Sequence, residues 1–575
     1  MNNLKNSVCT CIPPYPGLRP PLSVEGEFTR VQLNRVNLQK VLLFQIPPVF
    51  KNICTFAAEI ILAMKYPIGI QTFENIRTEG YAYVDKTALV YKLANEGKFY
   101  FLSRPRRFGK SLLLSTLKAY FQGKKELFDG LAMAELETEW NEYPIFHFDF
   151  NTGLYTNLEG LNSTMDYQLL KLEQRFGVDK ADLSLSDRFR ELISRAYEQT
   201  GQKVVILVDE YDKPLFETIG NPELQNEYRK ILKSFYGVEK TMDSYIRFAF
   251  FTGVTKFSKV SIFSDLNNLD DISLNNHYAD ICGVTERELY KNFDESIGEM
   301  AAINGISKDD CYAKLRKQYD GYHFSENSVG VYNPFSLLKT FSEGKFGDFW
   351  FATGTPTFLV EVLQHTDYPL DRLTTEEVDV RTMDSVDMMY SNPIPLLFQS
   401  GYLTIKDFDK EFKSYRLGFP NEEVERGFAQ FLGTYYFSGG MNGSFTINNF
   451  VRDVRNGDIE GFMTRLQALF ADGDYQVMGE MEIYFQNTLS VIFKLMGFYV
   501  QVERHTSRGR MDVTVQTRDY VYIMELKVDK TADEALQQIE DKQYAAPFAA
   551  DPRKLFKVGV RFGSESKGID EWKVV

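Results

Sequence analysis

The sequence predicts an α/β protein with two sheet-containing domains joined by a helical region. Apolar runs without polar alternation, at residues 99–103, 204–208 and 246–251, are separated by helix-patterned segments, as in a parallel sheet with crossover helices. A second pattern, at 509–527, shows two strands around a polar turn, which is typical of a hairpin. The 575 residues, 44% hydrophobic and 25% charged, are enough for three or four domains with large cores.

The N-terminal elements alternate between strand and helix. A first helix, capped by Asp85 or Thr87, runs to Leu93. The elements predicted after it are a strand at 99–103, a helix from Ser111, a strand at 145–150, helices at 158–176 and 187–199, and strands at 204–208 and 246–251. Parallel sheets of this kind bind their ligands at the carboxyl ends of the strands, so the residues that follow the strands are the candidates for function.

The loop after the first strand is the first candidate site. It reads Arg-Pro-Arg-Arg-Phe-Gly-Lys-Ser and matches a phosphate-binding loop, except that Arg104 replaces its first glycine. In such loops backbone N–H groups surround an anion, the lysine adds a positive charge, and the following hydroxyl ligates magnesium. The predicted nucleotide-binding residues are Arg104, Arg107, Phe108, Gly109, Lys110 and Ser111, with Ser111 also a magnesium ligand. The alternative is an ordinary helix start.

Two carboxylates end the most apolar strand, at 204–208. Asp209 is placed to hold a hydrated magnesium beside the β and γ phosphates, and Glu210 to polarise the attacking water. The strand at 246–251 ends in Thr-Gly-Val-Thr, from which Thr252 or Thr255 can reach the γ phosphate; we select Thr252. These features predict an ATP site with Mg²⁺. The alternative for Asp209 and Glu210 is a solvated strand end.

Residues 276–440 are predicted to form a helical lid. Within them, 402–405 and 415–419 are two short strands with a polar connection, which fits a winged-helix element or a plain hairpin equally well. His277 and His323 lie among aromatic residues, a setting more typical of core or surface histidines than of active bases.

The second candidate site lies on the C-terminal hairpin. Asp512 opens its first strand, while Glu525 and Lys527, two residues apart on the second, point to one face. A magnesium ion on the two carboxylates, with Lys527 orienting water, is sufficient to hydrolyse a phosphodiester. We expect Glu482, on a helix at 478–496, to complete the metal shell, with Glu503 as the alternative.

Two further observations concern this site. Gln538 and Lys542 share one face of a helix at 532–544 and are candidates to line a substrate groove. The alternative to a metal site is a set of solvent-exposed charged side chains without a functional role, because Glu and Lys often alternate on solvent-facing strands. The aspartate that opens the preceding strand favours the metal site.

Composition narrows the class of protein. A net charge of -14 argues against nonspecific coating of nucleic acid, although a local basic surface can still bind a polyanion. Five cysteines without paired spacing predict neither a zinc site nor a disulfide framework, which fits the reducing cytoplasm. Residues 1–63 are rich in proline pairs and lack periodicity, so we expect a dispensable extension or a start codon placed too far upstream, the alternative being a membrane or targeting element.

With both sites described, the chain resembles the bacterial AAA-ATPase-like family in which a P-loop domain precedes a C-terminal PD-(D/E)XK nuclease-type domain. The likeness runs from about residue 65 to the end. It rests on Tyr-Val-Asp-Lys-Thr at 83–87, the loop at 104–111, Val-Asp-Glu-Tyr-Asp-Lys-Pro at 208–214, Thr-Gly-Val-Thr-Lys-Phe-Ser at 252–258, and the Asp512, Glu525 and Lys527 set. The family is similar in carrying arginine for the first glycine, and Met511 stands here where the nuclease motif has proline.

The residue patterns and the resemblance together divide the chain into four regions: an extension at 1–63, an AAA-ATPase-like domain at 64–275, the lid with its winged-helix or hairpin element at 276–440, and a restriction-endonuclease-like α/β domain at 441–575. The leading hypothesis is an ATP-regulated, magnesium-dependent nuclease that acts on DNA. Defence against foreign DNA is one use of such an enzyme. It is expected in the cytoplasm, away from membranes, and as a homo-oligomer. The alternatives are a nucleotide-dependent switch whose C-terminal domain binds without cleaving, and an ATPase that remodels proteins.

Overall fold

The computed structural model describes residues 64–177, 183–257, 268–353, 359, 362–363, 368–374, 377–384, 392–436, 443–471, 481–497, 499–507 and 510–575. The expectations for residues 1–63 lie outside this range. Residues Lys65–Val575 form one structural unit.

The first sheet is parallel throughout, in the strand order β2-β3-β4-β1-β5. Its strands are β1 (Phe99–Ser103), β2 (Ile145–Asp149), β3 (Val204–Asp209), β4 (Ile246–Gly253) and β5 (Asp270–Asp271). The four longer strands confirm the prediction, and β3 is buried along its whole length, as expected of a central strand. Because β4 lies between β1 and β3, the phosphate loop and the acidic strand end open at the same edge of the sheet, with the end of β4 between them.

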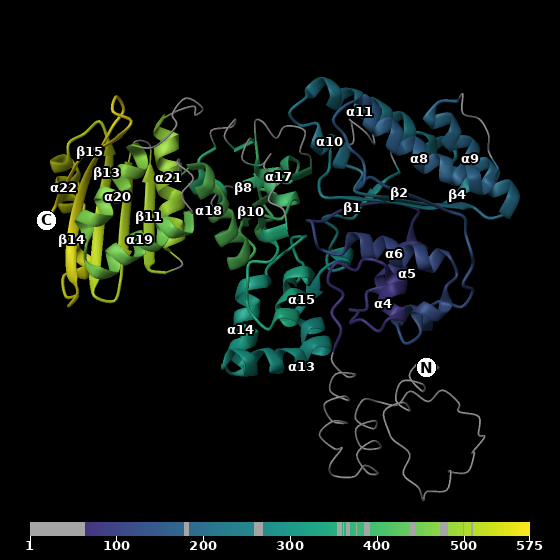
Figure 1. Ribbon diagram of the computed structural model, residues 1–575, viewed down its shortest axis with the longest axis horizontal. Helices are drawn as coiled ribbons and strands as arrows, with labels where there is room; N and C mark the ends of the chain where they lie inside the picture. Colours follow the sequence, from purple (N-terminus) through teal and green to yellow (C-terminus); the bar gives the residue numbers. More distant parts are fainter. Residues whose placement is uncertain are drawn as a thin grey trace, which may run out of the picture. The chain divides into compact units, whose positions relative to one another are not determined.

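Helices cover both faces of this sheet (Figure 1). One face carries α4 (Phe73–Thr78), α5 (Thr87–Glu96) and α6 (Lys110–Phe121), and the other carries α8 (Leu158–Phe176), α9 (Leu185–Thr200), α10 (Lys213–Glu217) and α11 (Pro222–Tyr236). The predicted bounds of α8 are confirmed, since Asn157 caps its first turn and Gly177 ends it in the left-handed region. Short helices α7 (Ala132–Leu136) and α12 (Val238–Thr241) complete the domain.

The region after the first sheet is mixed rather than purely helical. Its helices are α13 (Glu286–Asn304), α14 (Lys308–Tyr319), α15 (Pro334–Glu343), α17 (Ile394–Gln399) and α18 (Glu422–Tyr436). Strands β6 (Val284–Thr285) and β7 (Val331–Tyr332) pair, and β9 (Thr404–Asp409) and β10 (Ser414–Gly418) form the predicted hairpin, which β8 (Glu377–Asp379) extends to three strands. A third strand was not expected from the sequence.

The C-terminal sheet has the order β11-β12-β13-β14-β15 and is antiparallel except between β13 and β14, which the helix α22 connects. Its elements are β11 (Gln501–Ser507), β12 (Arg510–Gln516), β13 (Tyr520–Val528), α22 (Ala532–Asp541), β14 (Lys554–Gly563) and β15 (Gly568–Val574). Helices α19 (Gly443–Asn456), α20 (Ile459–Ala471) and α21 (Met481–Met496) precede the sheet (Figure 1). Gly559 on β14 faces the backbone of α22, whereas Tyr522 on β13 donates to the Val454 carbonyl of α19, so the helices cover opposite faces.

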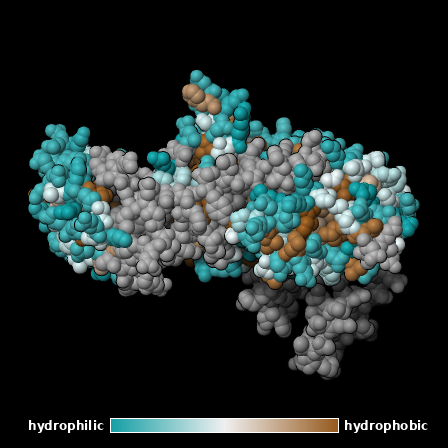
Figure 2. All heavy atoms as spheres, turned by 90° about the horizontal axis from the view of Figure 1, so that it is seen from above, coloured by the Kyte–Doolittle hydropathy of each residue, from teal (hydrophilic) through white to brown (hydrophobic). Residues whose placement is uncertain are grey.

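On the face shown in Figure 2, the described residues are mostly hydrophilic, with scattered apolar patches. Among the described residues, no helix combines the length and apolarity needed to cross a membrane. Cys282 and Cys311 are both buried free thiols.

Position 253, at the end of β4, requires glycine because the Asp212 side chain lies very close to its backbone. A Cβ there lies 2.3 Å from Oδ1 of Asp212, a side chain held by several hydrogen bonds. We expect Gly253→Ala to destabilise the N-terminal domain by about 1–3 kcal/mol, measured by chemical denaturation. Gly220→Ala is the control, because nothing lies within 4 Å of its Cβ position. Equal stability of the two variants contradicts this account.

Candidate nucleotide and metal sites

The phosphate loop wraps the N-terminus of α6. Gly109 is the N-cap residue and has a φ of 97°, in the left-handed region that glycine adopts without strain, and Arg107 also has a positive φ. The loop forms one wall of a cavity of about 760 Å³, to which Arg106, Arg107, Gly109, Lys110 and Ser111 contribute. This cavity is of a size that holds a nucleotide.

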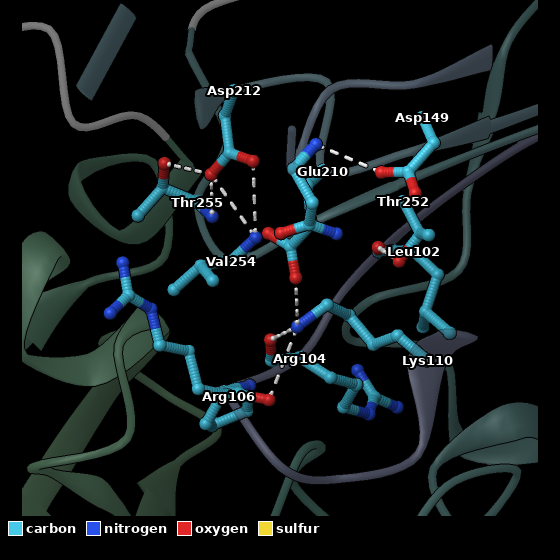
Figure 3. A network of polar contacts seen from close by, with 12 residues as sticks. Leu102, Arg104, Arg106, Lys110, Asp149, Glu210, Asp212, Thr252, Val254 and Thr255 are labelled. Carbon is cyan, nitrogen blue, oxygen red and sulfur yellow. Dashed lines mark hydrogen bonds and ion pairs between the residues drawn. The ribbon is translucent and has the colours of Figure 1, made fainter. Parts of the chain in front are cut away.

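Lys110 is buried at the base of this wall, with 4% of its side chain exposed. Its ammonium donates to the carbonyls of Arg104, at 2.9 Å, and Pro105, at 3.3 Å, and pairs with Oε1 of Glu210 at 3.3 Å (Figure 3). These contacts fix a positive charge where the cavity meets the loop. The structure thus brings two of the candidate site residues, Lys110 and Glu210, into contact.

Carboxylates gather opposite the loop. Asp209 lies beside Asp149 in the parallel register, and the Ser111 side chain is near enough to it to lower the pKa of its carboxyl in part. Burial raises the pKa of Asp209 to about 6, and its Oδ1 has no hydrogen-bond partner among the described residues. An orphaned carboxylate oxygen beside a hydroxyl fits the ligand set of a hydrated divalent cation. The structure therefore brings Ser111 and Asp209 together, and magnesium bound by them would neutralise phosphate charge.

Asp212 organises the loop that follows β4. Its carboxylate accepts from the backbone N–H of Val254 and, at 2.7 Å and 2.8 Å, from the N–H and hydroxyl of Thr255. Burial, followed by the nearby charge of Glu210, raises its pKa to about 7. One residue further on, the N–H of Lys256 donates to the side-chain oxygen of Gln399 at the end of α17. Asp212, three residues after β3, is thus bonded to the β4 loop, and that loop to α17.

Three predicted nucleotide contacts are not where the sequence placed them. The Thr252 hydroxyl is fully buried and donates to the Leu102 carbonyl of β1, inside the sheet. Phe108 is buried against the rings of Tyr322 and Phe324. The Arg104 guanidinium turns away from the cavity and donates to backbone carbonyls of the segment 273–279. Packing and backbone hydrogen bonds already occupy these three side chains, so they support the walls of the site and do not face the phosphate.

The cavity includes residues that sequence reasoning did not select. Asp149, at the end of β2, and Asp212 line it, and only their position after a strand hints at this. The lid contributes Phe335, Trp350 and Tyr402 to its wall. The cavity wall therefore joins sheet and lid, which places lid residues beside any bound nucleotide.

In the C-terminal sheet the structure brings together the residues selected for the second centre. Asp512 on β12 lies directly opposite Glu525 on β13, and both carboxylates are at least nine-tenths buried. Gln538 of α22 donates to Glu525 and accepts from the Lys527 ammonium, at 2.6 Å. Directly opposed residues of paired strands point to the same face. The carboxylate pair, beside a lysine, is a donor set suited to a hard divalent cation.

The remaining candidates at this centre are placed as follows. Glu482 belongs to α21, but its side chain lies outside the described residues. Glu503 is paired with Thr514 rather than with Asp512, whereas His505, which we did not select, is exposed and directly opposite Asp512. Lys542 is an exposed residue at the end of α22. Over the described part of the chain, no group of three or more His, Cys, Asp or Glu side chains forms a ready-made metal site.

Comparison with known proteins agrees with this division. Residues 67–263 match the family model described as "Predicted AAA-ATPase", and residues 480–572 match the PD-(D/E)XK nuclease superfamily. An uncharacterized protein in the vnfD 5' region of Azotobacter chroococcum mcd 1 is 36% identical over 516 residues, which cover 88% of this chain and 98% of that protein. The chain belongs to the AAA-ATPase-like family with a C-terminal PD-(D/E)XK domain. Domains of these two kinds generally use a nucleotide and a divalent metal.

Two solved structures match more distantly. The ORC2 protein of Aeropyrum pernix, solved as ADPNP-ADP complexes, is 12% identical with a TM-score of 0.23 and covers 58% of this chain and 88% of its own. Drosophila ORC bound to GC-rich DNA and Cdc6 is 7% identical with a TM-score of 0.20, covering 84% of this chain and 70% of its own.

In this AAA-ATPase-like protein, Trp350 connects the phosphate loop to the lid. Its indole N–H donates to the Arg106 carbonyl at 3.0 Å, and its backbone N–H donates to Oε1 of Glu423 at 2.7 Å. Glu423, fully buried on α18, also accepts from the Ser336 hydroxyl of α15. Burial raises the pKa of Glu423 to about 8, so the carboxyl is largely protonated in the folded protein at neutral pH.

Glu423 makes stability depend on pH. Its folded pKa of about 8 lies above the ordinary 4.5, so the folded state retains a proton that the unfolded state loses, and this stabilisation disappears as the pH rises through that window. We expect the unfolding temperature of the wild type to fall between about pH 4.5 and pH 8 more than that of Glu423→Gln, whose amide oxygen still accepts both hydrogen bonds. The exposed Glu411→Gln is the control. Parallel curves for wild type and Glu423→Gln contradict the assignment.

Proposed function

We propose that this protein binds and hydrolyses ATP, and that nucleotide state controls a magnesium-dependent nuclease site acting on DNA. The observation that carries the proposal is the placement of two separate charged centres, each at the position that its family motif requires. Defence against foreign DNA, a cytoplasmic location and assembly of several copies are parts of the same proposal.

The cavity at the first sheet supports the nucleotide half. Lys110 and the N–H groups at the start of α6 provide positive charge for the β and γ phosphates, and Ser111 and Asp209 provide magnesium ligands. Magnesium, when bound, stabilises charge that develops on the transferring phosphoryl group. Glu210 lines the cavity and takes the role of orienting and polarising water once phosphate draws Lys110 away from it.

The lid supports the regulatory half. Phe335 and Trp350 line the same cavity as Lys110, and the Trp350 indole is bonded to the loop itself. A nucleotide that fills the cavity therefore contacts lid residues, and its hydrolysis removes those contacts. A ligand shifts the equilibrium between two conformations only when its contacts differ between them.

The C-terminal pair supports the nuclease half. Asp512 and Glu525 would hold the metal, and Lys527 is placed beside them to orient water. The metal, when bound, would supply a nucleophilic water and offset negative charge on the phosphate. DNA is the proposed substrate, since the site's chemistry is directed at a phosphodiester.

A second function is favoured by one observation. The described side chains supply two carboxylates to the C-terminal centre and no larger metal-binding group. A nucleotide-dependent switch, whose C-terminal domain binds nucleic acid or protein without cleaving it, needs no complete metal shell.

Lys110 tests the nucleotide site. We expect Lys110→Ala to lower ATP affinity and to reduce turnover by about 10²-fold or more, because the phosphates lose their buried cation. Glu210→Gln is expected to keep binding and to lose turnover. ATP binding is measured by calorimetry and hydrolysis by phosphate release, with exposed Lys125→Ala as control. Unchanged turnover in Lys110→Ala refutes the site.

Asp512 separates the two functions. Asp512→Ala is expected to abolish magnesium-dependent nicking of a supercoiled plasmid and to leave ATP hydrolysis intact, since the two centres are formed by different sheets. Asp519→Ala, in the exposed turn of the same hairpin, is the matched control. Absence of nicking from the wild type argues for the switch, whereas nicking that persists in purified Asp512→Ala contradicts the assignment of cleavage to this centre.

A further inference from the structure

The α22 segment holds all three charged residues of the C-terminal centre. Gln538, within the helix, donates to Glu525 and accepts from Lys527. Tyr544, three residues after the helix ends, donates its hydroxyl to Oδ2 of Asp512 at 2.8 Å. The strands β12 and β13 supply the charges, and one crossover segment supplies a neutral partner for each.

The two contacts of Gln538 determine how its amide is oriented. Lys527 can only donate, so the amide oxygen must face it, and the amide nitrogen must then face the acceptor Glu525. The side chain therefore holds Glu525 and Lys527 at a fixed separation. A glutamate at this position cannot replace it, because it has no donor for Glu525 when ionised.

A strained turn brings Tyr544 to Asp512. Gln543 has a φ of 54°, in the left-handed region that non-glycine residues avoid, and the Tyr544 N–H returns to the Ile539 carbonyl at 3.1 Å. This turn ends α22 and directs the chain back toward β12. Glycine is the usual residue for such a helix end. The strain persists next to a contact with a site carboxylate, as strained backbone often does at functional sites.

We infer that Tyr544 and Gln538 are positioning residues that hold Asp512 and Glu525 in the arrangement that binds the divalent cation. The inference rests on the proposed nuclease function. Each neutral partner bonds to one oxygen of its carboxylate and so sets the orientation of that carboxylate, which would hold the cation. Partners of this kind orient metal ligands, and their removal costs about 10- to 100-fold in affinity in other metal sites.

The experiment measures Mn²⁺ binding to the full-length protein without nucleotide. Calorimetry on the wild type minus Asp512→Ala isolates binding at this centre. We expect Tyr544→Phe, which removes one oxygen, and Gln538→Leu each to weaken Mn²⁺ binding by about ten-fold or more. Gln537→Leu is the matched control, because Gln537 is exposed and bonds to Asp541 on its own helix. Plasmid nicking by Tyr544→Phe is expected to recover at saturating Mn²⁺.

The outcomes are distinct. Wild-type Mn²⁺ affinity in both Tyr544→Phe and Gln538→Leu overturns the inference and leaves the proposed nuclease intact. A wild type that binds no Mn²⁺ at this centre overturns both. Unfolding temperatures are recorded for every variant; weaker binding that only accompanies a lower unfolding temperature in both variants assigns the residues to stability and also overturns the inference.

Discussion

The buried guanidinium of Arg104 fixes the loop on which the nucleotide site depends. It donates to the carbonyl of Ser273 at 2.8 Å and to that of Tyr278 at 3.1 Å, and it lies 4.1 Å from the ring centre of Phe324. Burial lowers its pKa to about 10, so the group stays charged in neutral solution. Backbone carbonyls, rather than a carboxylate, surround this cation. Arg104 therefore anchors the first residue of the loop to the segment 273–279 and to Phe324. A glycine at this position has no side chain to make these contacts.

That constraint explains why the sequence located the site but not all its contacts. Motif spacing placed Lys110, Ser111, Asp209 and Glu210 at one edge of a parallel sheet, and the structure brings them together. The same spacing suggested that Arg104 faces phosphate. A sequence shows which residues lie in a loop, but the direction of each side chain depends on the segments that pack against it, and the segment near 273–279 is far away in the chain.

The C-terminal centre was easier to predict, because a hairpin has a period of two. Asp512, Glu525 and Lys527 share one face by pairing alone, without long-range packing. The contact of Tyr544 could not be predicted in this way. The sequence pattern predicts a helix through residue 544, whereas the structure ends α22 at Asp541, and the left-handed turn at Gln543 has no signal in the sequence. The third strand of the sheet around β9 and β10 was missed for a similar reason: β8 is three residues long and pairs across a long separation.

The bonds that join Asp212, the loop after β4 and Gln399 have a mechanical consequence. Buried N–H groups cannot be left without acceptors at low cost, so the loop must follow a shift of Asp212, and α17 must follow a shift of the loop. A short series of polar contacts therefore connects the segment after β3 to α17, separate from the aromatic contacts around Trp350. A rigid linkage of this kind transmits displacement without any side chain having to touch both ends.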